Sequence, residues 1–225
     1  MKRKKPDPRK NSRLFIILSP IIVLTFTWLG VKWCITSFPD HISWIPAFAG
    51  YYLTIGIVFL LSILIFRFNP LKHLDYNLKP RPRFPLLLWT IILPALLPLA
   101  AFITQAQYVP SHLFFFILLF ALINSFFEEI YWRGFLAFIP GPNSIRILLS
   151  ASLFSFSHFL FWDHWYPSPI IMIPTVVSTL IMGILWMHFM NKKKNIIYPI
   201  LSHMFVDILN LSVAVYSGLI NPPHF

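Results

Sequence analysis

Charged side chains are scarce in this sequence. Asp, Glu, Lys and Arg make up 11% of its 225 residues, against about 25% in an average soluble domain. Hydrophobic residues make up 57%, against roughly 45–50%. A soluble fold of this size leaves much of its surface facing water and could not hide so many apolar side chains. The composition therefore excludes an ordinary soluble domain and a disordered chain, and it favours several segments that cross a bilayer.

Cysteine and acidic residues are also few. Cys34 is the only cysteine, so no disulfide forms within the chain. Seven Asp and Glu stand against 18 Lys and Arg, which gives a net charge of +11. A basic balance can indicate nucleic-acid binding. Here the basic residues lie between apolar runs, so we expect anionic lipid headgroups, and no nucleic acid, to be their partner.

Seven apolar segments follow one another, each close to the ~20 residues that cross a bilayer. They are residues 14–36, 45–66, 84–106, 112–139, 145–162, 167–190 and 195–220. The first segment is too long for a cleavable signal peptide. The sequence predicts an all-α fold, a polytopic transmembrane helical bundle of about seven spans. An eighth, interfacial or re-entrant helix near 130–146 is the alternative.

The basic residues alternate along the chain. The tail 1–13 carries seven Lys and Arg, the loop 67–83 carries five and the loop 191–194 carries three. The loops in between carry none, and these are residues 37–44, 107–111 and 163–166. Because cytoplasmic loops are enriched in Lys and Arg, we expect a cytoplasmic N-terminus. The predicted regions are a basic tail, N-terminal helices, a helical core and a short tail, at residues 1–13, 14–106, 107–220 and 221–225.

Four ionisable residues lie inside the apolar segments: Glu128, Glu129, Arg133 and Asp207. Each costs about 2.5–3.5 kcal/mol near a bilayer centre, so such residues are functional candidates by default. Glu129 and Arg133 are four residues apart and share a helix face, which predicts a structural ion pair. Glu128 is rotated by about 100° from Glu129, and no local cation neutralises it.

Two histidines lie at a similar depth to these acids. His203, Asp207 and Asn210 form a polar stripe at i, i+4 and i+7 on an apolar helix. At 1.5 Å per residue, Glu128, His158, His203 and Asp207 each lie roughly 12–20 Å from the cytoplasmic end of their segment. A buried histidine is often only a packing residue. The shared depth instead predicts a site in which Glu128 acts as a general base.

Three motifs, in this order, resemble the CAAX protease and bacteriocin-processing family, also called the Abi family or type II CAAX prenyl endopeptidases. They are Glu-Glu-x-x-x-Arg from Glu128, Phe-x-x-x-His up to His158, and His-x-x-x-Asp from His203. The resemblance covers roughly residues 112–215. It implies an intramembrane endopeptidase with a helical-bundle fold, acting in CAAX-type cleavage or in bacteriocin or surface-protein processing, with residues 107–220 as its catalytic core.

The resemblance also implies roles for the site residues. Its catalytic residues would be Glu128, His158, His203 and Asp207, with Glu129 and Arg133 in support. Glu128 and His158 would activate a water, and His203 with the residue four positions on would stabilise the oxyanion. The family often has Asn at that last position. An ionised Asp repels an oxyanion, so Asp207 must be protonated, orient His203 or bind a metal.

The resemblance leaves open whether the mechanism depends on a metal. The family is often described as metalloproteases, yet a metal-free glutamate mechanism is the alternative. Two histidines and a carboxylate suit a catalytic zinc with one open position. The candidate ligands of a divalent metal such as Zn²⁺ are Glu128, His158 and His203, although the sequence has no His-Glu-x-x-His motif.

Three functions compete. An endopeptidase acting on a peptide or protein substrate near the cytoplasmic face is favoured by the three converging motifs. A non-catalytic scaffold or self-immunity protein can use the same fold. A proton-coupled transporter is the third, since buried Glu, His and Asp also relay protons, but the paired broken half-helices of transporters are missing. The small size and short loops predict a multi-pass protein of the bacterial inner membrane.

Overall fold

The computed structural model describes residues 8–74, 88–165 and 169–219. Every regular element within these residues is a helix, which confirms the predicted all-α class. The tail 1–13 and the loop 67–83 lie partly outside the described residues, and the tail 221–225 lies wholly outside them.

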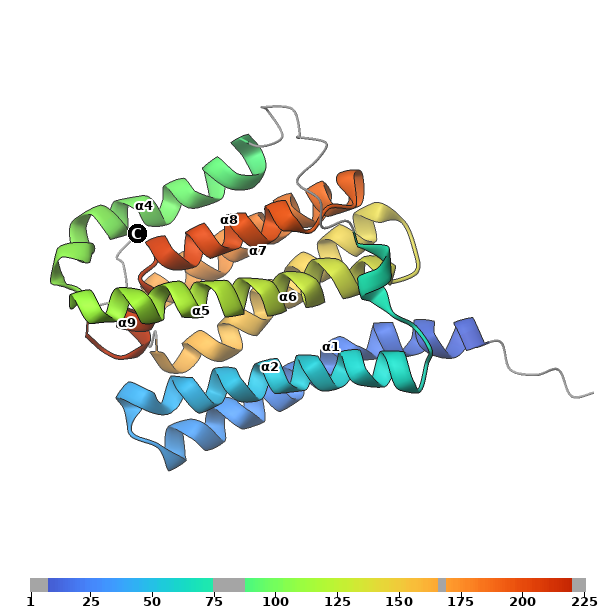
Figure 1. Cartoon of the computed structure of the whole chain (residues 1–225), viewed down its shortest axis with the longest axis horizontal. Helices are drawn as coiled ribbons and strands as arrows, with labels where there is room; N and C mark the ends of the chain where they lie inside the picture. The colour runs from blue at the N-terminus through green and yellow to red at the C-terminus, as the bar shows by residue number, and fades with distance from the viewer. Residues whose placement is uncertain (1–7, 75–87, 166–168, 220–225) are drawn as a thin grey trace, which may run out of the picture.

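The first two long helices form an antiparallel hairpin (Figure 1). Helix α1 spans Pro8–Ser37, and α2 spans Asp40–Leu64. Pro39 caps α2, whose first turn holds Asp40, and a carboxylate there interacts favourably with the helix dipole. After α2 the chain makes a short 3₁₀ turn, η1, at Pro70–His73.

The third apolar passage is bent. It consists of η2 (Leu88–Ile92), α4 (Leu93–Gln105) and the 3₁₀ turn η3 (Ala106–Tyr108). The stretches Leu88–Leu96 and Pro98–Tyr108 meet at 41°. Membrane helices tolerate such proline bends because neighbouring groups satisfy the freed backbone. This bent passage lies against α8, so it covers one side of the candidate site.

The acid pair lies where the fourth span changes its helical form. Helix α5 (Ser111–Glu129) continues into the π-helical turn η4 (Ile130–Phe135) and the 3₁₀ turn η5 (Leu136–Phe138). All six residues of η4 are buried. Single π-helical turns within helices are frequent at functional sites. The described residues 130–138 thus continue the span, so the alternative of a separate helix near 130–146 is wrong for them.

Four helices complete the part of the chain that the structure describes. They are α6 (Asn143–Trp165), α7 (Pro169–Lys193), α8 (Ile197–Leu209) and α9 (Ser212–Tyr216). The predicted last span, 195–220, is divided: Leu211 has φ 53° in the left-handed region, which ends α8 and starts the short α9. Helix α6 lies against α7, and α5 lies against α8 (Figure 1).

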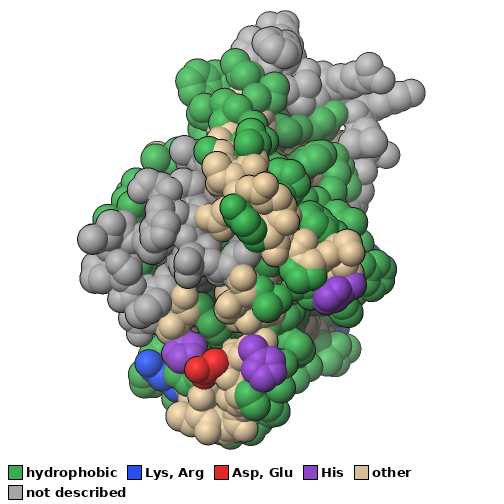
Figure 2. Space-filling model, turned by 90° about the vertical axis from the view of Figure 1, so that its left-hand side faces the viewer, with side chains coloured by type: hydrophobic (Ala, Val, Ile, Leu, Met, Phe, Trp, Pro, Cys, Tyr) green, Lys and Arg blue, Asp and Glu red, His purple; other side chains and the backbone are tan. Residues whose placement is uncertain are grey.

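The surface is that of a membrane protein. Five of the described helices are long and apolar enough to cross a bilayer, or six with the bent third passage, and α8 is a shorter apolar helix. Large apolar side chains such as Leu53, Ile103 and Phe115 are about two-thirds exposed, and green hydrophobic atoms cover much of the face in Figure 2. The chain is an integral membrane protein, whereas the exact number of seven spans stays a prediction.

Candidate active site

Three helices bring the predicted acids and histidines together. Glu128 lies at the end of α5, His158 within α6, and His203 with Asp207 on α8. The Oε2 atom of Glu128 lies 3.5 Å from His203 Nε2 and 3.8 Å from His158 Nε2. His203 Nε2 lies 3.6 Å from Asp207 Oδ1. All four residues are buried or nearly so, so the spacing in the sequence corresponds to one compact cluster.

The backbone of α6 fixes the imidazole of His158. Its Nδ1 lies 2.9 Å from the carbonyl oxygen of Phe154, and a carbonyl only accepts, so Nδ1 carries the hydrogen. Nε2 of His158 then faces Glu128 Oε2. Phe154, four residues earlier, meets the imidazole edge to face at 4.3 Å. The Phe-x-x-x-His spacing thus places both the ring and the carbonyl that orient His158.

A carboxylate and an indole orient His203. Nδ1 of His203 donates to Oε1 of Glu129 at 2.8 Å, and the imidazole stacks on Trp186 at 4.9 Å between ring centroids. The Trp186 indole N–H donates to the carbonyl of Thr90 and to Ser202 Oγ, each at 3.0 Å. His203 is therefore held by Glu129 of α5 and by Trp186 of α7, and Trp186 is itself bonded to η2. The Nε2 atom of His203 points at Glu128 and Asp207.

The predicted ion pair between Glu129 and Arg133 is confirmed. Arg133 Nη1 lies 2.9 Å from Glu129 Oε1, and both side chains are fully buried. The guanidinium carbon of Arg133 lies 3.8 Å from the ring centre of Phe154 and 4.9 Å from that of Trp186. Among the described residues, its Nε and Nη2 have no hydrogen-bond acceptor, and these aromatic faces attract the cation instead.

Asn124 is a residue that the sequence analysis missed. Its Nδ2 lies 2.9 Å from Asp207 Oδ2 and 3.5 Å from Glu128 Oε2. Its Oδ1 accepts a hydrogen bond of 2.9 Å from the hydroxyl of Tyr52 on α2. The available signal was its place four residues before Glu128, which puts both side chains on one face of α5.

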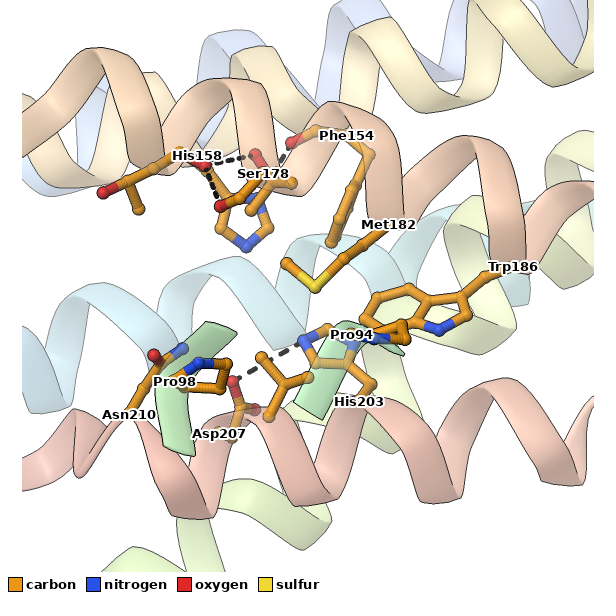
Figure 3. Close-up of a pocket in the computed structure, with 13 residues that line it drawn as sticks. Pro94, Pro98, Phe154, His158, Ser178, Met182, Trp186, His203, Asp207 and Asn210 are labelled. Carbon is orange, nitrogen blue, oxygen red and sulfur yellow. Dashed lines mark hydrogen bonds and ion pairs between the residues drawn. The ribbon is translucent and has the colours of Figure 1, made fainter. Parts of the chain in front are cut away.

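A cavity of about 40 Å³, lined by His158, His203 and Asp207, adjoins this cluster and can admit water. Figure 3 shows His158 on one side of it, His203 and Asp207 on the other, and Met182 between them. Asn210, from the predicted polar stripe, also lines the cavity, as do Pro94 and Pro98 at the bend of α4. Buried acids, imidazoles and space for water are the components that a hydrolytic site requires.

The geometry of these side chains can be compared with the metal site predicted from the sequence. Among the described residues, no group of three or more His, Cys, Asp or Glu has the arrangement to hold a metal ion. Nδ1 of His203 is already used by Glu129, and Nδ1 of His158 by the backbone. A zinc at Glu128, His158 and His203 gains no support from this geometry and stays a prediction.

The apolar helical bundle buries acids and imidazoles next to a cavity. These features are typical of polytopic membrane proteins that have a site within the membrane. Residues 110–209, just under half of the chain, match the family model Rce1-like, type II CAAX prenyl endopeptidase Rce1-like. Over these residues the chain is similar to this family, which confirms the resemblance of the three motifs and indicates a CAAX-type intramembrane protease. No curated protein and no solved structure matches the chain.

Proposed function

We propose that the protein is an intramembrane endopeptidase that hydrolyses a peptide bond near the cytoplasmic membrane face by a water that Glu128 and His158 activate. The observation that carries this proposal is the convergence of Glu128 Oε2 with Nε2 of His158 and of His203, two histidines that line a cavity able to admit water. The match to the Rce1-like family supports the reaction class.

The water is held by two acceptors. One of its hydrogens points to Glu128 Oε2 and the other to His158 Nε2, which accepts because Nδ1–H is bound to the Phe154 carbonyl. Glu128 removes the first proton as the oxygen attacks the scissile carbonyl carbon. Glu128 then returns this proton to the leaving nitrogen, so peptide and water become a carboxylic acid and an amine.

The oxyanion of the tetrahedral intermediate needs a hydrogen-bond donor. In our proposal His203 carries a hydrogen on both nitrogens: Nδ1–H is held by Glu129, and Nε2–H points to the oxyanion. Asp207 accepts from Asn124 through Oδ2, and its Oδ1 lies near His203 Nε2. We therefore assign Asp207 to orienting His203, one of the three roles left open by the sequence.

The substrate is a membrane-associated peptide or protein whose scissile bond reaches the depth of Glu128. In this proposal the basic loops face the cytoplasm and contact anionic lipid headgroups. The bacterial inner membrane is the proposed location, on the basis of the short connections between the helices.

The test compares protein termini in cells that carry the wild type with those in cells that carry Glu128→Gln or His158→Gln at equal abundance. Both substitutions keep the size of the side chain close to native; the first removes the carboxylate base and the second removes the imidazole. We expect new termini only with the wild type. Identical termini in all three, with all proteins folded, would contradict a protease and favour a non-catalytic scaffold.

A further inference from the structure

We propose that Asn124 and Tyr52 are positioning residues of this site. Tyr52 fixes the orientation of the Asn124 side-chain amide, and the amide holds the carboxylates of Asp207 and Glu128 at a set distance. The catalytic meaning of this inference rests on the proposed endopeptidase function. The hydrogen bonds that carry it stand on the geometry alone.

The chemistry of the partners leaves one orientation for the amide. Carboxylates accept hydrogen bonds, so the NH₂ group of Asn124 must face Asp207 and Glu128. The oxygen of the amide then faces Tyr52, whose hydroxyl donates to it at 2.9 Å. The ring of Tyr52 stacks on Phe127 with 5.1 Å between centroids, so the hydroxyl is held in place. Without this donor, the amide oxygen would lose its partner and only the carboxylates would hold the amide.

The Asn124 amide, which bridges Asp207 and Glu128, sets the spacing of these two acids across two helices. Asn124 and Glu128 belong to α5, and Asp207 belongs to α8. Two carboxylates that approach one another in a low dielectric repel strongly, and a donor shared between them offsets this repulsion. The shorter bond, 2.9 Å against 3.5 Å, goes to Asp207. Asn124 therefore ties α8, with His203 on it, to the helix that carries the general base.

The inference also gives the N-terminal hairpin a part in the site. Helix α2 lies outside the family match, which starts at residue 110. Two successive tyrosines of α2 nevertheless reach the catalytic core: Tyr52 binds Asn124, and the Tyr51 hydroxyl accepts from the indole of Trp132 at 2.8 Å. Residues 110–209 alone would lack the donor that orients the amide.

A charge exchange tests the bridge to Asp207. Asn124→Asp places a third carboxylate beside the other two, and we expect the product termini of the wild type to form about tenfold more slowly or not at all. The double variant Asn124→Asp/Asp207→Asn restores an amide–carboxylate pair between the two positions, although Glu128 still loses its donor. We expect this variant to recover part of both the cleavage rate and the unfolding midpoint in detergent. A double variant no better than Asn124→Asp would overturn the proposal.

A matched pair of tyrosine variants tests the orientation by Tyr52. Tyr52→Phe keeps the ring and removes the donor, and we expect cleavage to fall about fivefold. The control is Tyr131→Phe, which removes a buried hydroxyl that donates to Ser19 Oγ at 3.1 Å without touching the acids. We expect the control to cleave like the wild type. Equal cleavage by the two tyrosine variants would overturn the role of Tyr52.

The unfolding measurement separates this inference from the proposed function. If the wild type makes no new termini, the endopeptidase function fails, and the catalytic role of the bridge fails with it. The thermodynamic coupling between positions 124 and 207 still decides whether the bridge exists. Coupling without any cleavage would thus contradict the proposed function alone, and no coupling would contradict the bridge.

Discussion

Glu128 and Glu129 are adjacent acids with different surroundings. Glu129 shares Oε1 between Arg133 and His203 at 2.9 Å and 2.8 Å, so this oxygen serves to hold the two cationic partners in place. Glu128 faces the two Nε2 atoms at 3.5 Å and 3.8 Å, which is longer than the usual N–H···O hydrogen bond, so neither imidazole holds it tightly. The rotation of 100° per residue in a helix produces this division.

The ion pair with Glu129 makes Arg133 a stability residue. We expect Arg133→Met to destabilise the protein by about 3–5 kcal/mol, because it leaves the charge of Glu129 buried without its partner. Arg133→Lys keeps the charge but loses the flat stacking on Phe154, so we expect a smaller loss. Unfolding in detergent measures both, with exposed Arg13 replaced by Met as the control. An unchanged midpoint for Arg133→Met would contradict this account.

Metal removal tests the route of water activation. In the proposed mechanism Glu128 and His158 activate the water, so we expect purified protein to keep its cleavage rate after dialysis against a strong chelator. A loss that Zn²⁺ restores would show instead that the predicted ligands hold a metal.

The contacts that helical geometry predicted from the sequence are those between residues a few positions apart. Glu129 and Arg133, or Phe154 and His158, are four positions apart, so helical geometry alone predicts their contact. Asn124 meets Asp207 across 83 positions, and Tyr52 meets Asn124 across 72. No local period encodes such contacts, because they depend on how the helices pack. The polar bridge was therefore invisible to pattern analysis, although its end points were predicted.

At the scale of the elements, α6 and α7 approach each other closely at Gly183. A Cβ added there would lie 3.0 Å from Ala151 Cβ and 3.1 Å from Ala151 Cα. Overpacking costs about 1–3 kcal/mol, and the gain in helix propensity from Gly to Ala is at most ~1 kcal/mol. We expect Gly183→Ala to lower the unfolding midpoint in detergent.

The matched control for this substitution is Gly56→Ala within α2, where an added Cβ meets nothing within 4 Å. Only the higher helix propensity of Ala affects stability there, so the control is expected to unfold at the same temperature or slightly higher. If Gly183→Ala behaves like Gly56→Ala, the two helices are not in close contact at this point.

The elements themselves were largely predictable, and their irregularities were not. Runs of apolar residues predicted where helices cross, because a bilayer requires satisfied backbone groups. The π-helical turn after Glu129 and the break at Leu211 have no marker such as Gly or Pro at their start. Both arise from packing around buried side chains, which a hydropathy pattern does not contain.

The connections between the helices are divided between the two ends of the bundle. The turns between α1 and α2 and between α4 and α5 lie at one end of the bundle, and the start of α1 and the turn after α5 lie at the other (Figure 1). Basic loops alternate in the same way along the sequence. The arrangement agrees with the expected alternation, and the side that faces the cytoplasm stays a prediction from the positive-inside rule.

Labelling of single cysteines tests this orientation. Cys34 is 1% exposed, so it contributes little background. We expect Arg13→Cys and Lys193→Cys to react only after a membrane-impermeant reagent reaches the cytoplasm, and His41→Cys to react from outside. All three side chains are exposed. Reaction of His41→Cys and Lys193→Cys from the same side would refute the alternation.

The central claim is that this bundle hydrolyses peptide bonds through Glu128. Isolated membranes containing the wild type or Glu128→Gln would be incubated in H₂¹⁸O, and new carboxyl termini would be sought by mass spectrometry. Hydrolysis places one ¹⁸O atom from water in each new carboxyl group. The account predicts labelled termini with the wild type and none with Glu128→Gln. Labelled termini in equal amount from both, or from neither, would contradict it.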